Sequence, residues 1–353
     1  MLKSMLEKNR KKQYLFFAII AILFIFSLVK FFQGTLISTN TISSQDFIDT
    51  ILPNSSLSLI VEPNDGMSPI LYLIGHATSS IDIVMYQFED AQIEQALVSA
   101  KVRGVAVRVL LNEGYYGKPE TANQSAYAYF SAHGIAVKWT PAHFALTHQK
   151  TIITDDDDAM ILTFNFTPQY YATSRDFALN DKNQNDVLAI EKVFNADWQG
   201  NEIAPPQGSD LVWSPRSKNE ILSLIDSATS SLFIYNEEMA DPDIITALES
   251  AANRGVNVQI VMTYASDWKS AFAELVSSGV HIRTYASSAS LYIHAKMIVV
   301  DDTTAFVGSQ NFSAASMNDN RELGIMFTDQ NIIHSLDGFF QTDWQGARAM
   351  KTI

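Results

Sequence analysis

The chain has 353 residues, of which 47% are hydrophobic and 18% are charged, so it is long enough for about two packed domains and is not a disordered polymer. It contains no cysteine, which excludes disulfides and cysteine-ligated metals. The net charge is −14, and residues 1–33 carry six basic and one acidic side chains, so the body beyond them has a net charge of −19. An acidic body disfavours tight binding of nucleic acid, whose phosphates attract basic surfaces, although it leaves room for a local basic site.

The N-terminal segment has the pattern of a membrane anchor. Lys30 is the only charged residue within residues 14–33, and the basic tail at residues 1–13 favours a cytoplasmic location for that end. We therefore expect a single-pass transmembrane helix at 14–33, a linker at 34–55 and the rest of the chain outside the cytoplasm. A cleaved secretory signal is the alternative, because the uninterrupted apolar part ends at Val29 and is short for a spanning helix.

An internal repeat divides the body into two halves. Three short stretches recur at a constant offset of 151 positions, which chance rarely produces. They are residues 77–80 and 228–231 (ATSS), 96–97 and 247–248 (AL), and 103–105 and 254–256 (RGV). We expect one half at 56–203 and the other at 210–353, joined by a linker with proline and glycine at 204–209.

Each half begins with the same predicted elements. A β-rich run at 81–86 precedes apolar residues at helical spacing over 93–100, and a second apolar run follows at 105–111. The second half repeats this order at 232–235, 244–251 and 256–262. Strand, helix, strand is the βαβ unit of a parallel sheet, which predicts an α/β protein.

Further along the chain, both halves contain a motif of the form H-x-K-x4-D. Its copies are His148, Lys150 and Asp155 in the first half, and His294, Lys296 and Asp301 in the second. Three more positions match at distances of 15, 17 and 28 residues after each histidine: Thr163, Asn165 and Asp176, and Ser309, Asn311 and Glu322. A single His-x-Lys pair is usually an ordinary surface feature, but six matched positions at one spacing indicate a functional site.

The spacing of the motif places its histidine and lysine together. The residues around it are β-branched and apolar, which predicts a strand, and residues i and i+2 of a strand project from the same face. A lysine ammonium can bind a phosphate oxygen, an imidazole can act as nucleophile or proton donor, and amide and hydroxyl side chains can donate hydrogen bonds. Such a cluster suits the spread negative charge of a phosphoryl-transfer transition state, and the interpretation requires no metal and no cofactor.

This chemistry needs two histidines, one from each half. One imidazole attacks phosphorus while the other protonates the leaving oxygen and then activates water against the phosphohistidine. We expect His148 and His294 to converge about a pseudo-twofold axis. Asp176 and Glu322 would each orient a histidine through its other ring nitrogen.

The doubled motif, together with residues 308–313 (GSQNFS) and 320–322 (NRE), resembles the phospholipase D superfamily over residues 56–345. The resemblance implies two α/β/α lobes, a phosphohistidine intermediate and no metal. It also implies that His148 is the nucleophile and His294 the general acid.

The motif aspartates, Asp155 and Asp301, are implied by the same resemblance to be structural, holding the end of a strand and its turn. The acidic run at 155–158 lies between two predicted strands, so a solvated hairpin turn accounts for it better than a metal site. The first copy departs from the family pattern, with Leu162 where the second copy has Gly308. That difference predicts an altered fit to the substrate.

The substrate stays open among several classes. A lipid hydrolase of the phospholipase D type is favoured, because the predicted anchor holds the site at a bilayer and the body is acidic. A metal-independent nuclease for single strands and a phosphatidyltransferase resembling cardiolipin synthase are alternatives that use the same first step. A non-catalytic binding protein is disfavoured because both histidines and both lysines are present. We expect the chain to work as a monomer on a phospholipid or another phosphodiester.

Overall fold

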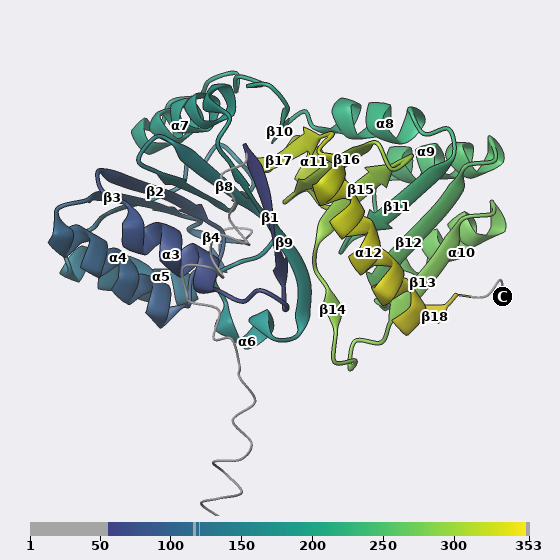
Figure 1. The fold of residues 1–353 in the computed structure, drawn as a ribbon, viewed down its shortest axis with the longest axis horizontal. Coiled ribbons are helices and arrows are strands. Elements are labelled where there is room, and N and C mark those ends of the chain that lie inside the picture. The colour runs from purple at the N-terminus through teal and green to yellow at the C-terminus, as the bar shows by residue number, and fades with distance from the viewer. Residues whose placement is uncertain (1–55, 116–117, 120, 351–353) are drawn as a thin grey trace, which may run out of the picture. The chain divides into compact units, whose positions relative to one another are not determined.

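A computed structural model of the protein describes residues 56–115, 118–119 and 121–350, and these residues form two similar lobes, each built on one sheet (Figure 1). The tail, anchor and linker expected at residues 1–55 lie outside the described residues. Within the described ranges, no helix combines the length and the apolar character that crossing a membrane requires.

The sheet of the first lobe has the strand order β1-β9-β8-β7-β2-β3-β6. Its strands are β1 (Leu57–Glu62), β2 (Ser80–Met85), β3 (Ala106–Leu111), β6 (Ala136–Trp139), β7 (Thr151–Thr154), β8 (Asp158–Leu162) and β9 (Ser174–Asp181). β2, β3 and β6 are parallel, whereas β7, β8, β9 and β1 are joined antiparallel. The short strands β4 (Gly114–Tyr115) and β5 (Lys118–Pro119) form a separate pair.

The second lobe repeats this arrangement in the order β10-β17-β16-β15-β11-β12-β13-β18. Its strands are β10 (Leu211–Ser214), β11 (Ser231–Tyr235), β12 (Asn257–Thr263), β13 (His281–Tyr285), β15 (Lys296–Val300), β16 (Thr304–Gly308), β17 (Glu322–Phe327) and β18 (Arg348–Ala349). The predicted βαβ units are present, but each sheet is mixed. The reason is that β7 and β15 enter tight hairpins, which can join only antiparallel strands.

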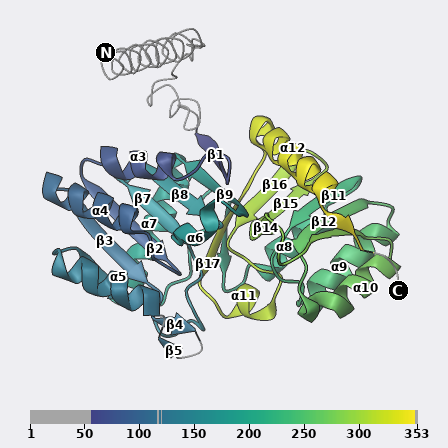
Figure 2. The same ribbon diagram turned by 90° about the horizontal axis from the view of Figure 1, so that it is seen from below.

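Helices cover both faces of each sheet, so each lobe has the expected α/β/α layers (Figure 2). One face of the first sheet carries α3 (Ser68–His76), α4 (Ala91–Arg103) and α5 (Thr121–Ala132), and the same face of the second carries α8 (Lys218–Asp226), α9 (Pro242–Asn253) and α10 (Lys269–Ser277). The opposite faces meet α7 (Gln184–Gln199) and α12 (Gln330–Gly346), which share one hydrophobic core with both sheets. The remaining short helices are α6 (Pro168–Tyr171), η1 (Ser266–Trp268) and α11 (Ala314–Asn318).

The repeated Arg-Gly-Val stretch ends one helix and secures another. Gly104 follows α4 with φ of 100°, a backbone conformation that glycine adopts without strain. Arg103 donates to the carbonyl oxygens of Ile74 and Ala77 at the end of α3, at 2.9 and 3.3 Å. In the second lobe Arg254 donates in the same way to the residues that end α8. The repeat is therefore conserved between the halves for the packing of the first two helices.

The repeated Ala-Thr-Ser-Ser stretch binds the motif aspartates through hydrogen bonds. The carboxylate of Asp155 accepts from the backbone N–H groups of Thr78, Ser79 and Ser80 at 2.7–3.0 Å, and from the hydroxyls of Thr78 and Ser79. Burial acts to raise the pKa of Asp155, but these hydrogen bonds outweigh it and hold the pKa well below its usual range. Asp301 binds residues 229–231 identically. Each aspartate thus ties the β-hairpin of the motif to the start of the neighbouring strand.

Two reciprocal ion pairs join the lobes. Arg175 of β9 binds Asp343 of α12, with Nε–Oδ2 and Nη2–Oδ1 distances of 2.7 and 3.2 Å. Arg321, just before β17, binds Asp197 of α7 at 3.0 and 2.9 Å. Both arginines are buried, so each lobe sends one guanidinium to the last helix of the other.

Arg321→Met is expected to lower the free energy of unfolding by about 3–5 kcal/mol, because it leaves the buried Asp197 carboxylate without its partner. Urea denaturation followed by circular dichroism measures this change. Arg348→Met is the control, since this side chain is exposed on β18 and an exposed substitution usually changes the stability by about 0.5 kcal/mol or less. An equal loss in both variants would show that the bridge between the lobes contributes nothing special.

Candidate active site

The segment that carries each motif histidine is attached to the opposite lobe. β14 (Tyr292–Ile293), which precedes His294, pairs in parallel with β9 of the first lobe. The carbonyl oxygen of Arg175 accepts from the N–H groups of His294 and Ala295 at 3.3 and 2.9 Å.

The segment that carries His148 in the first lobe is bound by the second lobe in the same way. Thr147 forms a bridge with Arg321, whose carbonyl oxygen accepts from the N–H groups of His148 and Gln149 at 2.9 and 3.0 Å. Backbone hydrogen bonds from the neighbouring lobe therefore position both histidines.

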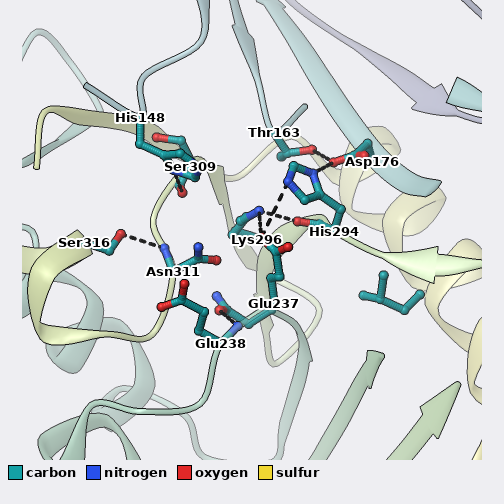
Figure 3. A network of polar contacts seen from close by, with 12 residues as sticks. His148, Thr163, Asp176, Glu237, Glu238, His294, Lys296, Ser309, Asn311 and Ser316 are labelled. Atoms are coloured by element: carbon teal, nitrogen blue, oxygen red, sulfur yellow. Dashed lines mark hydrogen bonds and ion pairs between the residues drawn. The ribbon is translucent and has the colours of Figure 1, made fainter. Parts of the chain in front are cut away.

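Each histidine is also oriented by a carboxylate of the opposite lobe. His148 Nδ1 lies 2.9 Å from Glu322 Oε2. His294 Nδ1 lies 2.8 Å from Asp176 Oδ1 (Figure 3). A carboxylate at Nδ1 fixes the ring orientation and leaves Nε2 as the reactive nitrogen. Neither lobe alone supplies both the histidine and the carboxylate of such a pair at Nδ1.

Both carboxylates are held by further hydrogen bonds. Glu322 Oε1 accepts from Ser316 Oγ at 2.7 Å and from Asn320 Nδ2 at 3.1 Å, and Asp176 Oδ1 accepts from Thr163 Oγ1 at 2.6 Å. Thr163 is fully buried, so its hydroxyl supports the carboxylate instead of facing a phosphate as we had expected.

Ser309 differs from the expectation in the same way. It is also fully buried; its hydroxyl donates to the Leu323 carbonyl oxygen at 3.3 Å, and its own carbonyl oxygen lies 3.2 Å from His148 Nδ1. Asn165 and Asn311 are nearly buried, and their side-chain oxygens have no hydrogen-bond partner among the described residues. Each amide oxygen is thus an unpaired acceptor, and rotation of the amide by about 180° would present its N–H donors at the same place.

The electrostatic environment keeps His148 neutral. Burial lowers its pKa, and the nearby Lys150 and Lys296 lower it further, against the opposing effect of Glu322. Burial acts to raise the pKa of Glu322, but His148 and Lys150 outweigh it and hold the carboxyl in its ionised form. A neutral imidazole oriented by an ionised carboxylate is the form that attacks phosphorus.

The two lysines point inward and are almost completely buried, at 1% exposure for Lys150 and 0% for Lys296. Each Nζ donates to the carbonyl oxygen of its own motif histidine at 2.6 Å. Burial, with a smaller contribution from Lys296, lowers the pKa of Lys150 to about 7. A buried ammonium keeps a strong attraction for a phosphate oxygen because little water screens it.

Sequence reasoning missed three side chains that complete the site: Glu237, Tyr292 and Tyr86. Glu237 follows β11 and contacts Lys296 Nζ at 3.0 Å, His294 Nε2 at 3.5 Å and the Tyr292 hydroxyl at 2.8 Å (Figure 3). Tyr86 occupies the position 151 residues earlier, where its ring meets the His148 ring edge-on at 4.8 Å. The repeat offset could have flagged this position, because it is where the halves differ.

No group of three or more histidine, aspartate or glutamate side chains in the described part of the chain is arranged to hold a metal ion. In the acidic run, residues 155–157 form the turn between β7 and β8, and Asp158 is the first residue of β8. Asp155 and Asp156 have φ values of 55° and 59° there, and Asp301 and Asp302 have the equivalent geometry in the second lobe.

Two similar lobes with paired histidines and lysines at their junction define a phospholipase D-like protein. The chain belongs to this family: the family described as cardiolipin synthase, PLD-like domain, matches residues 70–198 and 221–344, one match in each lobe. The resemblance expected from the doubled motif is therefore confirmed.

Several curated relatives carry the name cardiolipin synthase. The chain is 22% identical over 345 residues to the probable cardiolipin synthase YwiE of Bacillus subtilis, covering 85% of this chain and 68% of the relative. It is 24% identical over 345 residues to cardiolipin synthase 1 of Staphylococcus epidermidis, covering 84% and 69%. Hydrolysis, which we favoured from the sequence, is therefore less well supported than the alternative of phosphatidyl transfer.

Solved structures with low sequence identity share the fold. The phosphatidylserine synthase of Haemophilus influenzae Rd KW20 matches with a TM-score of 0.67 and 14% identity, over 87% of this chain and 92% of that one. The polyphosphate kinase of Porphyromonas gingivalis matches with a TM-score of 0.66 and 16% identity, over 82% and 47%. At these identities the likeness establishes the architecture alone.

Phosphodiester turnover is expected to fall as the pH rises through about 7, because Lys150 then loses the proton with which it attracts phosphate. Lys150→Arg keeps its charge, so the basic limb of the kcat/KM profile should move up by about one pH unit or more. Lys182→Arg, at a partly exposed lysine beside Asp158, is the matched control. A limb that stays in place in Lys150→Arg would show that another group sets it.

Proposed function

We propose that the protein is a phosphatidyltransferase that moves a phosphatidyl group onto the hydroxyl of a second phospholipid, as a cardiolipin synthase does. The observation that carries this proposal is the pair of histidines, each bound at Nδ1 by a carboxylate of the opposite lobe and each accompanied by a buried lysine. This arrangement suits two successive displacements at one phosphorus atom.

The first displacement forms a phosphohistidine. His148 Nε2 attacks phosphorus, the bond to the glycerol oxygen breaks, and His294 donates a proton to that oxygen. Lys150 and Lys296 stabilise the charge that spreads over the non-bridging oxygens, and Asn165 and Asn311 donate hydrogen bonds from their amides.

The second displacement reverses the roles. His294, now neutral, accepts the proton of the acceptor hydroxyl, whose oxygen attacks phosphorus and releases His148. Asp176 stabilises the imidazolium form of His294 in both steps, and Glu322 does the same for His148.

Two observations favour transfer to an alcohol over hydrolysis. The curated relatives carry the name cardiolipin synthase. The two motif lysines and both orienting carboxylates are buried, and a site that limits the access of water would protect a reactive intermediate until an alcohol arrives. A nuclease is disfavoured by the net charge of the body, which repels a polyanion.

A lipid substrate also agrees with the apolar segment at residues 14–33. We propose that this segment anchors the chain, with the active site outside the cytoplasm, because the basic residues of the tail precede it. An anchored enzyme meets its substrate in the plane of the bilayer.

The full-length protein, reconstituted in phosphatidylglycerol vesicles with EDTA, is expected to form cardiolipin and an equal amount of glycerol. His148→Asn and His294→Asn should each reduce the rate by about 10³-fold or more, because one removes the nucleophile and the other the proton donor. His281→Asn, an exposed histidine on β13, should leave the rate unchanged. Lipid products are measured by mass spectrometry.

The other outcomes identify the alternatives. Phosphatidate as the main product would support hydrolysis, and cleavage of a labelled single-stranded oligonucleotide without lipid turnover would support a nuclease. Loss of activity with EDTA would contradict the proposed mechanism.

The roles of the two histidines can be separated with a p-nitrophenyl phosphodiester, whose leaving group departs without a proton. We expect His294→Asn to release a burst of p-nitrophenol equal to the amount of enzyme, since His148 still attacks. His148→Asn should give no burst. The reverse pattern in stopped-flow absorbance would make His294 the nucleophile.

A further inference from the structure

The carboxylate of Glu237 makes the contacts that a phosphate oxygen of the substrate would make. Its Oε2 atom lies 3.0 Å from Lys296 Nζ, which binds the non-bridging oxygens in the proposed reaction, and 3.5 Å from His294 Nε2, which protonates the leaving oxygen. Tyr292 donates to the other oxygen at 2.8 Å and holds the carboxylate in this position. Burial acts to raise the pKa of Glu237, but Lys296 and His294 outweigh it, so the carboxyl is ionised.

The first lobe has no carboxylate at the equivalent position. Tyr86 stands there, 151 residues before Glu237, with its ring 5.2 Å from Lys150 Nζ and edge-on to His148. The aromatic ring places no negative charge beside Lys150. The carboxylate of Glu237 offsets part of the charge of Lys296.

A fixed negative charge beside the reacting phosphorus distinguishes ligands that carry one negative charge from ligands that carry two. A phosphodiester carries one negative charge, whereas a phosphomonoester carries close to two at pH 7.5. The repulsion from Glu237 scales with the charge of the ligand, so it penalises the monoester twice as much in free energy.

We propose that Glu237 is a specificity residue that favours singly charged phosphodiesters over doubly charged phosphomonoesters at this site. The proposal rests on the proposed function insofar as it places the reacting phosphate beside Lys296 and His294. It predicts weak binding of phosphatidate, the monoester that accidental hydrolysis would produce, so that this by-product leaves the site free for the diester.

Removal of the charge should act on the two ligand classes by different factors. We expect Glu237→Gln to tighten the binding of glycerophosphoglycerol, a diester, on the order of tenfold. This is about the effect of removing one repulsion between two unit charges roughly 5 Å apart at an intermediate effective dielectric. Glycerol 3-phosphate, a monoester with the same glycerol group, should then tighten by about the square of that factor, on the order of 100-fold.

The dissociation constants are measured at pH 7.5 by isothermal titration calorimetry on the full-length protein, with His148→Asn in every variant so that the diester is not consumed. Glu238→Gln is the matched control, because it removes a neighbouring carboxylate that bonds Ser313 instead of Lys296. Glu237→Asp retains the charge and is expected to retain the preference for the diester.

Equal tightening of both ligands by Glu237→Gln, or no tightening of either, would overturn the proposal. The same squared pattern in Glu238→Gln would also overturn it, since the effect would then come from the general charge of the site. These affinities do not depend on turnover. Failure of the vesicle assay would therefore count against the transferase function alone. The role of Glu237 would still be tested by how much Glu237→Gln changes the two dissociation constants relative to each other.

Discussion

The structure depends on an exchange of partners between its two halves. His148 is bound by Glu322 and His294 by Asp176, so each histidine finds its carboxylate in the other lobe. The carboxylates are buried, and a buried charge without a partner costs several kcal/mol. Separating the lobes would leave two such charges at once, which makes the interface obligatory and gives the site a geometry that neither half can form.

One short stretch in each lobe produces this exchange. The carbonyl oxygen of Arg321 binds the backbone of the His148 segment, its guanidinium binds Asp197 of α7, and the next residue is the carboxylate of Glu322. Arg175 and its neighbour do the same for the second lobe. Backbone, ion pair and carboxylate act from adjacent positions, so a shift of this strand would disturb the fold and the site together.

Much of the fold could be predicted from the sequence because the duplication repeats physical requirements. The stretches at 77–80 and 103–105 recur since each lobe must bind its motif aspartate and end its helix at a glycine. The exchange of carboxylates could not be predicted, because spacing is the same whether Asp176 serves His148 or His294. Only the pairing of β14 with β9 decides between them. Glu237 was missed for a related reason: a search for matched positions finds what the halves share and overlooks the place where they differ.

That difference makes two equal motifs chemically unequal. Lys296 shares its charge with Glu237, whereas Lys150 faces the ring of Tyr86 and has its pKa lowered to about 7 by burial. On the same side, burial and both lysines keep His148 neutral and ready to attack. On the other side, His294 has carboxylates near both ring nitrogens, Asp176 at Nδ1 and Glu237 at Nε2, so its Nε2 atom already has a neighbour and is less free to attack phosphorus. Our proposed assignment of nucleophile and acid therefore rests on the neighbours of the motifs, since the motifs themselves are too alike to distinguish the two roles.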